Sequence, residues 1–141
     1  MVLAGAAALI AVLATGNTAK QDFIKIGADD VPSVKLIIGE ERKITSVSTT
    51  TENGVTKKII KYKVSERQNR EMQKYAETLI SDYGYYYVYS DNDFSGTSGI
   101  DLQLVKASVE ADHILYVRID YDREGYTVMI TRGRGTLTII N

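Results

Sequence analysis

The sequence lacks cysteine and tryptophan and has one proline and one histidine among its 141 residues. Without cysteine there is no disulfide scaffold, no thiolate metal site, no thiol nucleophile and no cysteine to carry a lipid anchor. An excess of one charge is also missing, because 17 basic and 18 acidic residues leave a net charge of −1. No overall field favours nucleic acid or an anionic membrane surface, and we expect no nucleic-acid partner.

What the chain does have is the composition of a folded domain with an excess of tyrosine. Hydrophobic residues make up 44% and charged residues 25%, as in ordinary globular proteins. Ten tyrosines stand against two phenylalanines, and aromatic and β-branched residues crowd the second half. Since such residues favour half-buried strands, we expect one strand-rich domain around a single core.

Residues 2–14 form one uninterrupted apolar run, and the first charge after it is Lys20. A membrane-spanning helix needs about 20 apolar residues, whereas a secretory apolar region needs roughly 7–15. We therefore predict a signal peptide or membrane anchor segment over residues 1–19, although no Lys or Arg precedes the run; a buried helix is the alternative. The expected location is extracytoplasmic, that is periplasmic, secreted or membrane-anchored, with membrane contact only through residues 2–14 if they are uncleaved.

The next segment is polar and carries turn signals. Residues 20–33 contain Gly27, the pair Asp29-Asp30 and the only proline, a composition typical of a linker. We predict a linker over residues 20–33 and a single domain over residues 34–141. Apolar residues alternate over residues 34–38, which predicts a short first strand.

A hairpin is expected over Ile44–Thr51 and Val55–Val64, because Asn53-Gly54 lies between two β-rich runs. Both residues of an Asn-Gly pair tolerate positive φ, which a two-residue hairpin turn requires. The second arm alternates lysine with apolar residues, so that one of its faces should meet the core. The residues expected on that face are Ile60, Tyr62 and Val64.

One long helix is expected over residues 66–83. Ser65 is placed as its N-cap, Gln68 completes a capping box, and Gly84 is placed to end the helix in the left-handed conformation. Apolar residues recur at three-and-four spacing, which we interpret as a core-facing stripe and not as a partner-binding face. The stripe consists of Met72, Tyr75, Ala76, Leu79, Ile80 and Tyr83.

The second half predicts strands and a second, short helix. Tyr85–Tyr89 is apolar on both sides, which is typical of a central strand covered on one face. Residues 100–111 fit either a strand or a small-faced helix, and we favour the helix. Strands are then expected over residues 113–121, 126–131 and 136–140 as a meander with turns at 122–125 and 132–135.

Together these elements predict an α+β fold behind the apolar N-terminal segment. It has a mixed, mostly antiparallel sheet of about six to seven strands, with one long and one short helix packed on it.

The loop after Tyr89 holds the most suggestive group of metal ligands. Asp91, Asp93 and Ser95 supply oxygen atoms at alternate positions before a glycine, as in the first half of a calcium-binding loop. The twelfth position is Leu102, where such loops have a bidentate glutamate. These three residues are our candidate calcium ligands, and a plain solvated turn is the alternative that we favour; no other cofactor is expected.

Other reactive residues are scattered. His113, the only histidine, follows Asp112 at the start of a strand, where adjacent side chains point to opposite faces. Arg132–Gly135 is too short a basic stretch for a phosphate or RNA site, and the tyrosine run is interpreted as packing. Four aspartates are possible partners in a carboxylate pair: Asp101, Asp112, Asp120 and Asp122.

The order of elements over Glu66–Thr131 resembles the small α/β domains of bacterial envelope proteins. The resemblance lies in Met72–Tyr89, a helix leading into a Tyr-Val-Tyr-Ser-Asp strand end, and in Leu104–Ala107 leading into Ala111–Leu115. Similar domains occur in the outer-membrane activators of penicillin-binding proteins, in the curli-secretion lipoprotein and at the N-terminus of the Tol-system β-propeller protein. The resemblance implies a non-catalytic envelope domain that contacts other proteins.

We therefore expect a non-catalytic exported domain that acts as a protein-binding or assembly module, with a protein partner in the cell envelope. Two alternatives are a small hydrolase that uses carboxylates or His113, and a subunit of a membrane-associated complex that retains the N-terminal helix.

Overall fold

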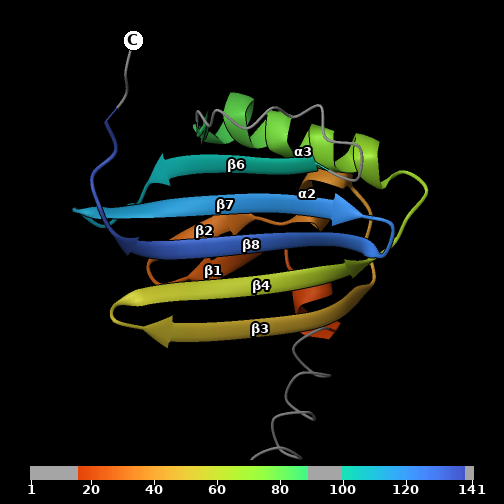
Figure 1. Cartoon of the computed structure of the whole chain (residues 1–141), viewed down its shortest axis with the longest axis horizontal. Coiled ribbons are helices and arrows are strands. Elements are labelled where there is room, and N and C mark those ends of the chain that lie inside the picture. The colour runs from red at the N-terminus through yellow and green to blue at the C-terminus, as the bar shows by residue number, and fades with distance from the viewer. Residues whose placement is uncertain (1–15, 89–99, 139–141) are drawn as a thin grey trace, which may run out of the picture.

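The computed structural model describes residues 16–88 and 100–138 and has an α+β fold (Figure 1). Residues 16–20 are helical and lead into the first strand. The elements that follow are β1 (Phe23–Ile26), β2 (Asp29–Pro32), α2 (Val34–Ile38), β3 (Ile44–Glu52), β4 (Val55–Lys63), α3 (Gln68–Tyr83), β5 (Tyr86–Tyr87), β6 (Ile100–Ala107), β7 (His113–Asp122) and β8 (Gly125–Arg134).

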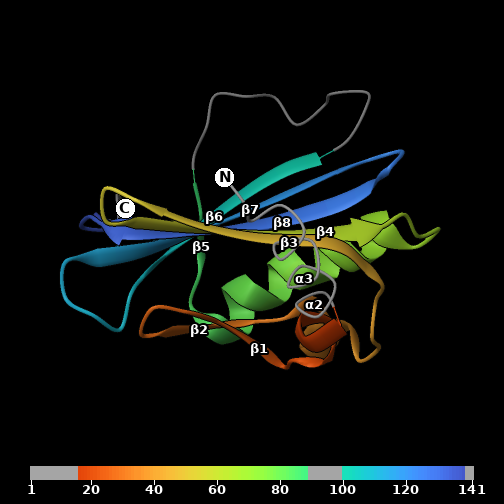
Figure 2. The same ribbon diagram turned by 90° about the horizontal axis from the view of Figure 1, so that it is seen from below.

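Six strands form the main sheet in the order β3-β4-β8-β7-β6-β5, and β1 and β2 form a separate two-stranded hairpin. All these pairings are antiparallel, so the sheet is not mixed within the described residues. Figure 2 shows α2, α3 and the β1–β2 hairpin on one face of the sheet. We call this the inner face and the opposite one the outer face. The predicted α+β class is confirmed, but the described residues form eight strands in two sheets, where one sheet of about six to seven strands was predicted.

The core lies between the inner face and the elements that cover it. Alternate residues of β7 and β8 point inward because side chains along a strand alternate between its two faces. The predicted strand over residues 113–121 is confirmed as β7, and its inward residues Leu115, Val117, Ile119 and Tyr121 are all buried. From the other side α3 contributes its buried stripe, Met72, Tyr75, Ala76 and Leu79, while Ile80 and Tyr83 pack against it half-buried.

Helix α3 begins two residues later than expected, with Arg67 and not Ser65 at the N-cap position, whereas its predicted end at Gly84 is confirmed. Ser65 and Gln68 form a turn in front of the helix, in which the Ser65 N–H donates to Gln68 Oε1 at 3.3 Å and Ser65 Oγ accepts from the Arg67 N–H at 3.2 Å. Gly84 ends the helix with φ 77°, a left-handed conformation that glycine adopts without strain.

The β3–β4 hairpin turns at Asn53 and Gly54 as predicted, with φ of 53° and 78°. Ile60 and Tyr62 are buried in the core. Val64 was expected beside them, but it lies beyond the end of β4 and is 47% exposed.

The predicted linker over residues 20–33 is wrong. Strands β1 and β2 turn at Gly27 and bury Ile24, Ile26 and Val31, so the packed part of the chain begins well before residue 34. Of the polar residues that indicated a linker, Asp30 lies on the exposed side of this hairpin, whereas Asp29 is buried next to the turn. Two apolar residues per strand are enough here because the hairpin lies against a core that the larger sheet provides.

The predicted first strand over residues 34–38 is the helix α2 instead. Ser33 caps it by accepting the Leu36 N–H on its side-chain oxygen at 3.1 Å, and Gly39 ends it with φ 86°. The caps override the strand preference of the β-branched residues between them.

Three predictions for the second half are also corrected. Residues 100–107 form β6 and not a helix, because a long strand here gains a full ladder with β7. The predicted central strand over Tyr85–Tyr89 is wrong, because in its described residues the strand is Tyr86–Tyr87, which pairs with β6 at the sheet edge and has both side chains about half exposed. Arg132–Gly135 is not a hairpin turn, because β8 continues to Arg134 and residues 135–138 form no strand.

The apolar run over residues 2–14 lies outside the described residues. In the part of the chain that the structure describes, no helix is long and apolar enough to cross a bilayer.

Candidate functional sites

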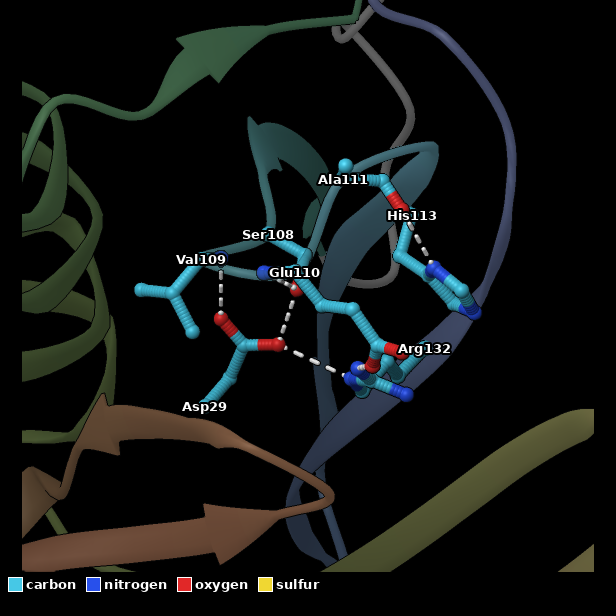
Figure 3. Close-up of polar contacts among 7 residues, drawn as sticks. All are labelled: Asp29, Ser108, Val109, Glu110, Ala111, His113 and Arg132. Carbon is cyan, nitrogen blue, oxygen red and sulfur yellow. Dashed lines mark hydrogen bonds and ion pairs between the residues drawn. The ribbon is translucent and has the colours of Figure 1, made fainter.

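The most concentrated polar group surrounds Asp29, which is 2% exposed at the start of β2 (Figure 3). Its carboxylate accepts hydrogen bonds from the Ser108 hydroxyl, from the Val109 N–H at 2.9 Å and from Arg132 Nε at 2.8 Å. Arg132 also pairs with Glu110. We call these five residues the Asp29 cluster; it joins the β1–β2 hairpin to the β6–β7 turn and to β8.

Glycine at position 27 makes room for this cluster. It turns the β1–β2 hairpin with φ 59°, and the Arg132 guanidinium lies against it. A Cβ atom at this position would come within 2.8 Å of Arg132 Cζ. The backbone of the hairpin therefore lies closer to the arginine than a residue with a Cβ atom would permit.

The charges of the cluster are held in their ionised forms. Burial alone would raise the pKa of Asp29, but the hydrogen bonds from Ser108, Val109 and Arg132 outweigh it and keep that pKa below its ordinary value. The hydrogen bond from Arg132 likewise lowers the pKa of Glu110, and both carboxylates raise the pKa of Arg132. An aspartate that is ionised and accepts three hydrogen bonds is poorly suited to take a proton from a substrate.

The hydroxyl and imidazole near this cluster are also engaged. Ser108 Oγ donates to Asp29 and accepts from the Glu110 N–H at 3.0 Å, and His113 Nδ1 lies 2.9 Å from the Ala111 carbonyl oxygen. Among the described residues no hydrogen bond joins the His113 ring to the Ser108 hydroxyl or to a carboxylate; the two residues are joined only through the backbone, where the Ser108 N–H donates to the His113 carbonyl oxygen at 2.9 Å. The nucleophile, base and orienting acid of a hydrolase are therefore not assembled at this position. The Asp29 cluster instead holds the β1–β2 hairpin against the β6–β7 turn and β8.

The four aspartates considered as a carboxylate pair are spread over β6, β7 and the turn between them. Asp101 and Asp120 are register partners on neighbouring strands, while Asp112 lies in the turn. Asp120 is exposed and borders a shallow polar hollow of about 260 Å³ together with Lys61 and Thr127. The side chains of Asp101 and Asp122 lie outside the described part of the structure, so the pair stays a hypothesis.

The candidate calcium ligands Asp91, Asp93 and Ser95 lie outside the described residues, and the calcium site stays a prediction. Within residues 16–88 and 100–138, no three His, Asp or Glu residues come together as a group able to hold a metal ion.

The outer face of the sheet is the second candidate site. No described element covers it (Figure 2), and it carries half-buried apolar side chains from three strands, Ile59, Tyr116 and Met129. The strand register places Ile59 beside Met129, and Met129 beside Arg118. The Tyr116 hydroxyl donates to the Gln103 side chain across β6 and β7. The face thus has an apolar centre with polar and cationic neighbours.

Strand β3 forms the long edge of this sheet and is exposed along most of its length. Its residues after Val47 are serine, threonine and one glutamate. Beside it, Lys57 and Lys61 of β4 point to the outer face, opposite Thr50 and Ser46. This end of the outer face is therefore cationic.

The fold and these surfaces define the class of protein: an α+β domain with an antiparallel sheet, of which the elements in residues 16–88 and 100–138 cover one face. Comparison with models of known protein families, with curated proteins and with solved structures gives no match. The resemblance to envelope domains over Glu66–Thr131 is therefore neither supported nor contradicted by them.

The sequence analysis did not identify the two central residues of the Asp29 cluster. Asp29 belonged to the predicted linker, and Arg132 to a predicted turn. The available signal was Gly27 between two short alternating apolar runs, which is a hairpin pattern and places the acid pair just after the turn. The pairing of Asp29 with Arg132 spans 103 residues of sequence, and no local pattern contains it.

Proposed function

We propose that the chain is a non-catalytic exported domain that binds another protein through the outer side of its sheet. The supporting observation is that the polar groups of the Asp29 cluster on the inner side have hydrogen-bond partners, whereas apolar side chains on the outer side stay partly exposed to solvent. On the inner side the Asp29 carboxylate has all its partners within the chain, whereas on the outer side Ile59, Tyr116 and Met129 stay partly accessible.

The composition of the outer face fits a protein interface. Such interfaces combine an apolar centre with a polar rim and are enriched in tyrosine, methionine and arginine. Here Tyr116, Met129 and Arg118 lie on adjacent strands, and Lys57 and Lys61 border them. In this proposal the apolar residues 2–14 deliver the domain to the outside of the cytoplasm or attach it to a membrane there.

Site-specific photo-crosslinking tests the proposal in cells that express the native chain. A photoreactive amino acid replaces Lys57 on the outer face or, as a matched control, Lys74, which is exposed on α3. We expect a discrete cross-linked protein from position 57 and none from position 74. The absence of adducts at position 57, or the same adducts from both positions, would contradict the proposal.

N-terminal sequencing of the native protein tests the exported state. A chain that starts near Asn17 or Lys20 indicates cleavage, and a chain that starts at Met1 and fractionates with membranes indicates an anchor. A protein that keeps Met1 and stays in the cytosol would contradict export.

A further inference from the structure

The free edge of β3 offers a long backbone surface. β3 pairs with β4 on one side and is the terminal strand of the sheet. Its nine residues span about 30 Å at the usual rise per residue of a strand. The opposite edge is β5, with only two residues. Of the two edges among the described strands, only β3 is long enough to hold an added strand of several residues.

The unpaired backbone groups of β3 are identified by the register. In an antiparallel ladder every second residue exchanges hydrogen bonds with its neighbour, and the residues between them direct their N–H and C=O groups outward. The Lys63 N–H donates to the Lys43 carbonyl oxygen at 3.0 Å, so the odd-numbered residues of β4 bond towards β3. Their partners are Ser46, Ser48, Thr50 and Glu52. Val47, Thr49 and Thr51 therefore direct their backbone groups away from the sheet.

The usual protections of an edge strand are few here. Natural edges are blunted by proline, by charged side chains, by bulges or by a covering element. Residues 44–52 contain no proline and one charge, Glu52, at the end next to the turn. The register irregularity lies between Ile44 and Ser46, at the opposite end. From Val47 to Thr51 the register is regular and the side chains are small; Ser48–Thr51 are exposed, and Val47 is partly buried against the core.

The charge beside this edge is positive. Ile44–Lys63 contains four lysines and one glutamate, a net charge of +3 in a chain whose total is −1. Neighbouring strands lie about 4.8 Å apart, so a strand added to β3 would lie roughly 10 Å from β4. The small side chains of Ser46 and Thr50 leave room for Lys61 and Lys57 to reach across β3 towards it. Lys58 is engaged elsewhere, since its Nζ donates to the Lys25 carbonyl oxygen.

We infer that β3 takes up an extended, acidic segment of a partner protein as an additional strand. This inference rests on the proposed binding function. It adds that β3 is the strand that binds and that the partner segment is acidic. Backbone groups of Val47, Thr49 and Thr51 provide the ladder, and Lys57 and Lys61 select Asp or Glu at alternate positions of the segment. A second copy of the chain fits less well, because pairing of two β3 edges would bring two lysine rows together.

The test is selection of random ten-residue peptides displayed on phage against the full-length chain. Selected peptides are then measured by fluorescence anisotropy on three variants. Thr49→Pro removes one outward N–H and no hydrogen bond to β4, a position where edge strands tolerate proline. Thr49→Val is its matched control and keeps the N–H. Lys57→Glu/Lys61→Glu reverses the charge and leaves the backbone unchanged. Circular dichroism checks that each variant is folded.

We expect selected peptides enriched in Asp and Glu at alternate positions. Thr49→Pro should weaken their binding at least tenfold, Thr49→Val less than twofold, and the double lysine variant at least tenfold. If Thr49→Pro does not fold, the double variant and protection of the Thr49 amide from hydrogen exchange on peptide binding decide. Selection without acidic bias, or equal binding to Thr49→Pro and Thr49→Val, would overturn the inference.

Two further results separate this inference from the function itself. If the chain sediments as a dimer that Thr49→Pro dissociates, a second copy occupies the edge and the inference is wrong. If photo-crosslinking from position 57 persists unchanged in Thr49→Pro, the chain binds a partner through its outer face, and only the role of the edge is overturned.

Discussion

The two faces of the sheet differ in how deeply their side chains are buried, although the same strands form both faces. Along β8, Val128 and Ile130 are fully buried on the inner face, while Met129 between them is half-buried on the outer face. Along β7, Val117 is fully buried and Tyr116 is not. The inner face is closed by α2, α3 and the β1–β2 hairpin (Figure 2). Among the described residues, the fully buried core therefore lies on one side of the sheet, and the other side is the one that we propose contacts a partner.

Polar groups show the same division. The Asp29 cluster brings three segments together with its carboxylate fully hydrogen-bonded. At the β3 edge of the sheet, a row of backbone groups has no partner strand among the described residues and lies beside a row of lysines. Substitutions in the first region should change the free energy of unfolding, and substitutions in the second should change binding. The predictions below test the first half of this division.

The largest loss of stability is expected for Asp29→Ala. The change leaves Arg132, Ser108 and the Val109 N–H without their buried acceptor, and removing one member of a buried ion pair costs about 3–5 kcal/mol. Urea denaturation measures the difference. Asp30→Ala is the control: this neighbour is exposed, and its change should stay within about 0.5 kcal/mol. Equal effects at the two positions would show that the cluster does not hold the hairpin.

The next largest effect separates two adjacent residues of β8. Ile130→Ala should cost about 3 kcal/mol, because it opens a cavity at a fully buried position. Met129→Ala, on the outer face, should cost about 1 kcal/mol, since its side chain is only partly buried and the change opens no enclosed cavity. Thermal and urea unfolding of the two variants make the comparison. Similar losses would mean that the outer face is as closed as the inner one.

Acid should remove part of the stability that Asp29 provides. The pKa of this group is lower in the folded state than in the unfolded chain, where it is about 3.9, so the unfolded state binds the proton more readily. The contribution is complete above about pH 4 and declines as the pH falls through the lower pKa of the folded protein. Unfolding free energies measured from pH 7 to pH 2.5 should fall over this window. Asp29→Asn should reduce the slope; an unchanged slope would show that other carboxylates, such as Glu110, produce it.

Local sequence patterns correctly predicted the elements that are determined by residues close to one another in sequence. The Asn53-Gly54 turn, the buried stripe of α3 and the alternation over β7 all depend on residues close in sequence, and the structure confirms them. The helix α2 was missed because its five residues are too few for a helical period to show, and its caps at Ser33 and Gly39 decide the conformation.

Contacts between distant segments were beyond the sequence pattern. Residues 20–33 are polar enough for a linker, and they fold because β1 and β2 bury Ile24, Ile26 and Val31 against a core contributed by other elements. The spacing of apolar residues over 100–107 is compatible with a helix, but these residues form a strand because they pair along their whole length with β7. The cationic edge could be read from the lysines of β4, whereas its position as a free edge follows only from the strand order.

The smallest effect concerns a buried hydroxyl group on the inner side of the sheet. Tyr126 is buried and stacks on Tyr62 with ring centroids 4.6 Å apart, yet its hydroxyl has no hydrogen-bond partner among the described residues. Tyr126→Phe should therefore leave the stability unchanged or raise it by up to about 1 kcal/mol, because an unsatisfied buried hydroxyl costs free energy. The matched control is Tyr75→Phe, whose hydroxyl donates to the Pro32 carbonyl oxygen at 2.6 Å and whose loss should cost about 1.5 kcal/mol. Urea denaturation of both variants decides: a loss at Tyr126 as large as that at Tyr75 would mean that its hydroxyl has a partner, and that the inner side is closed without exception.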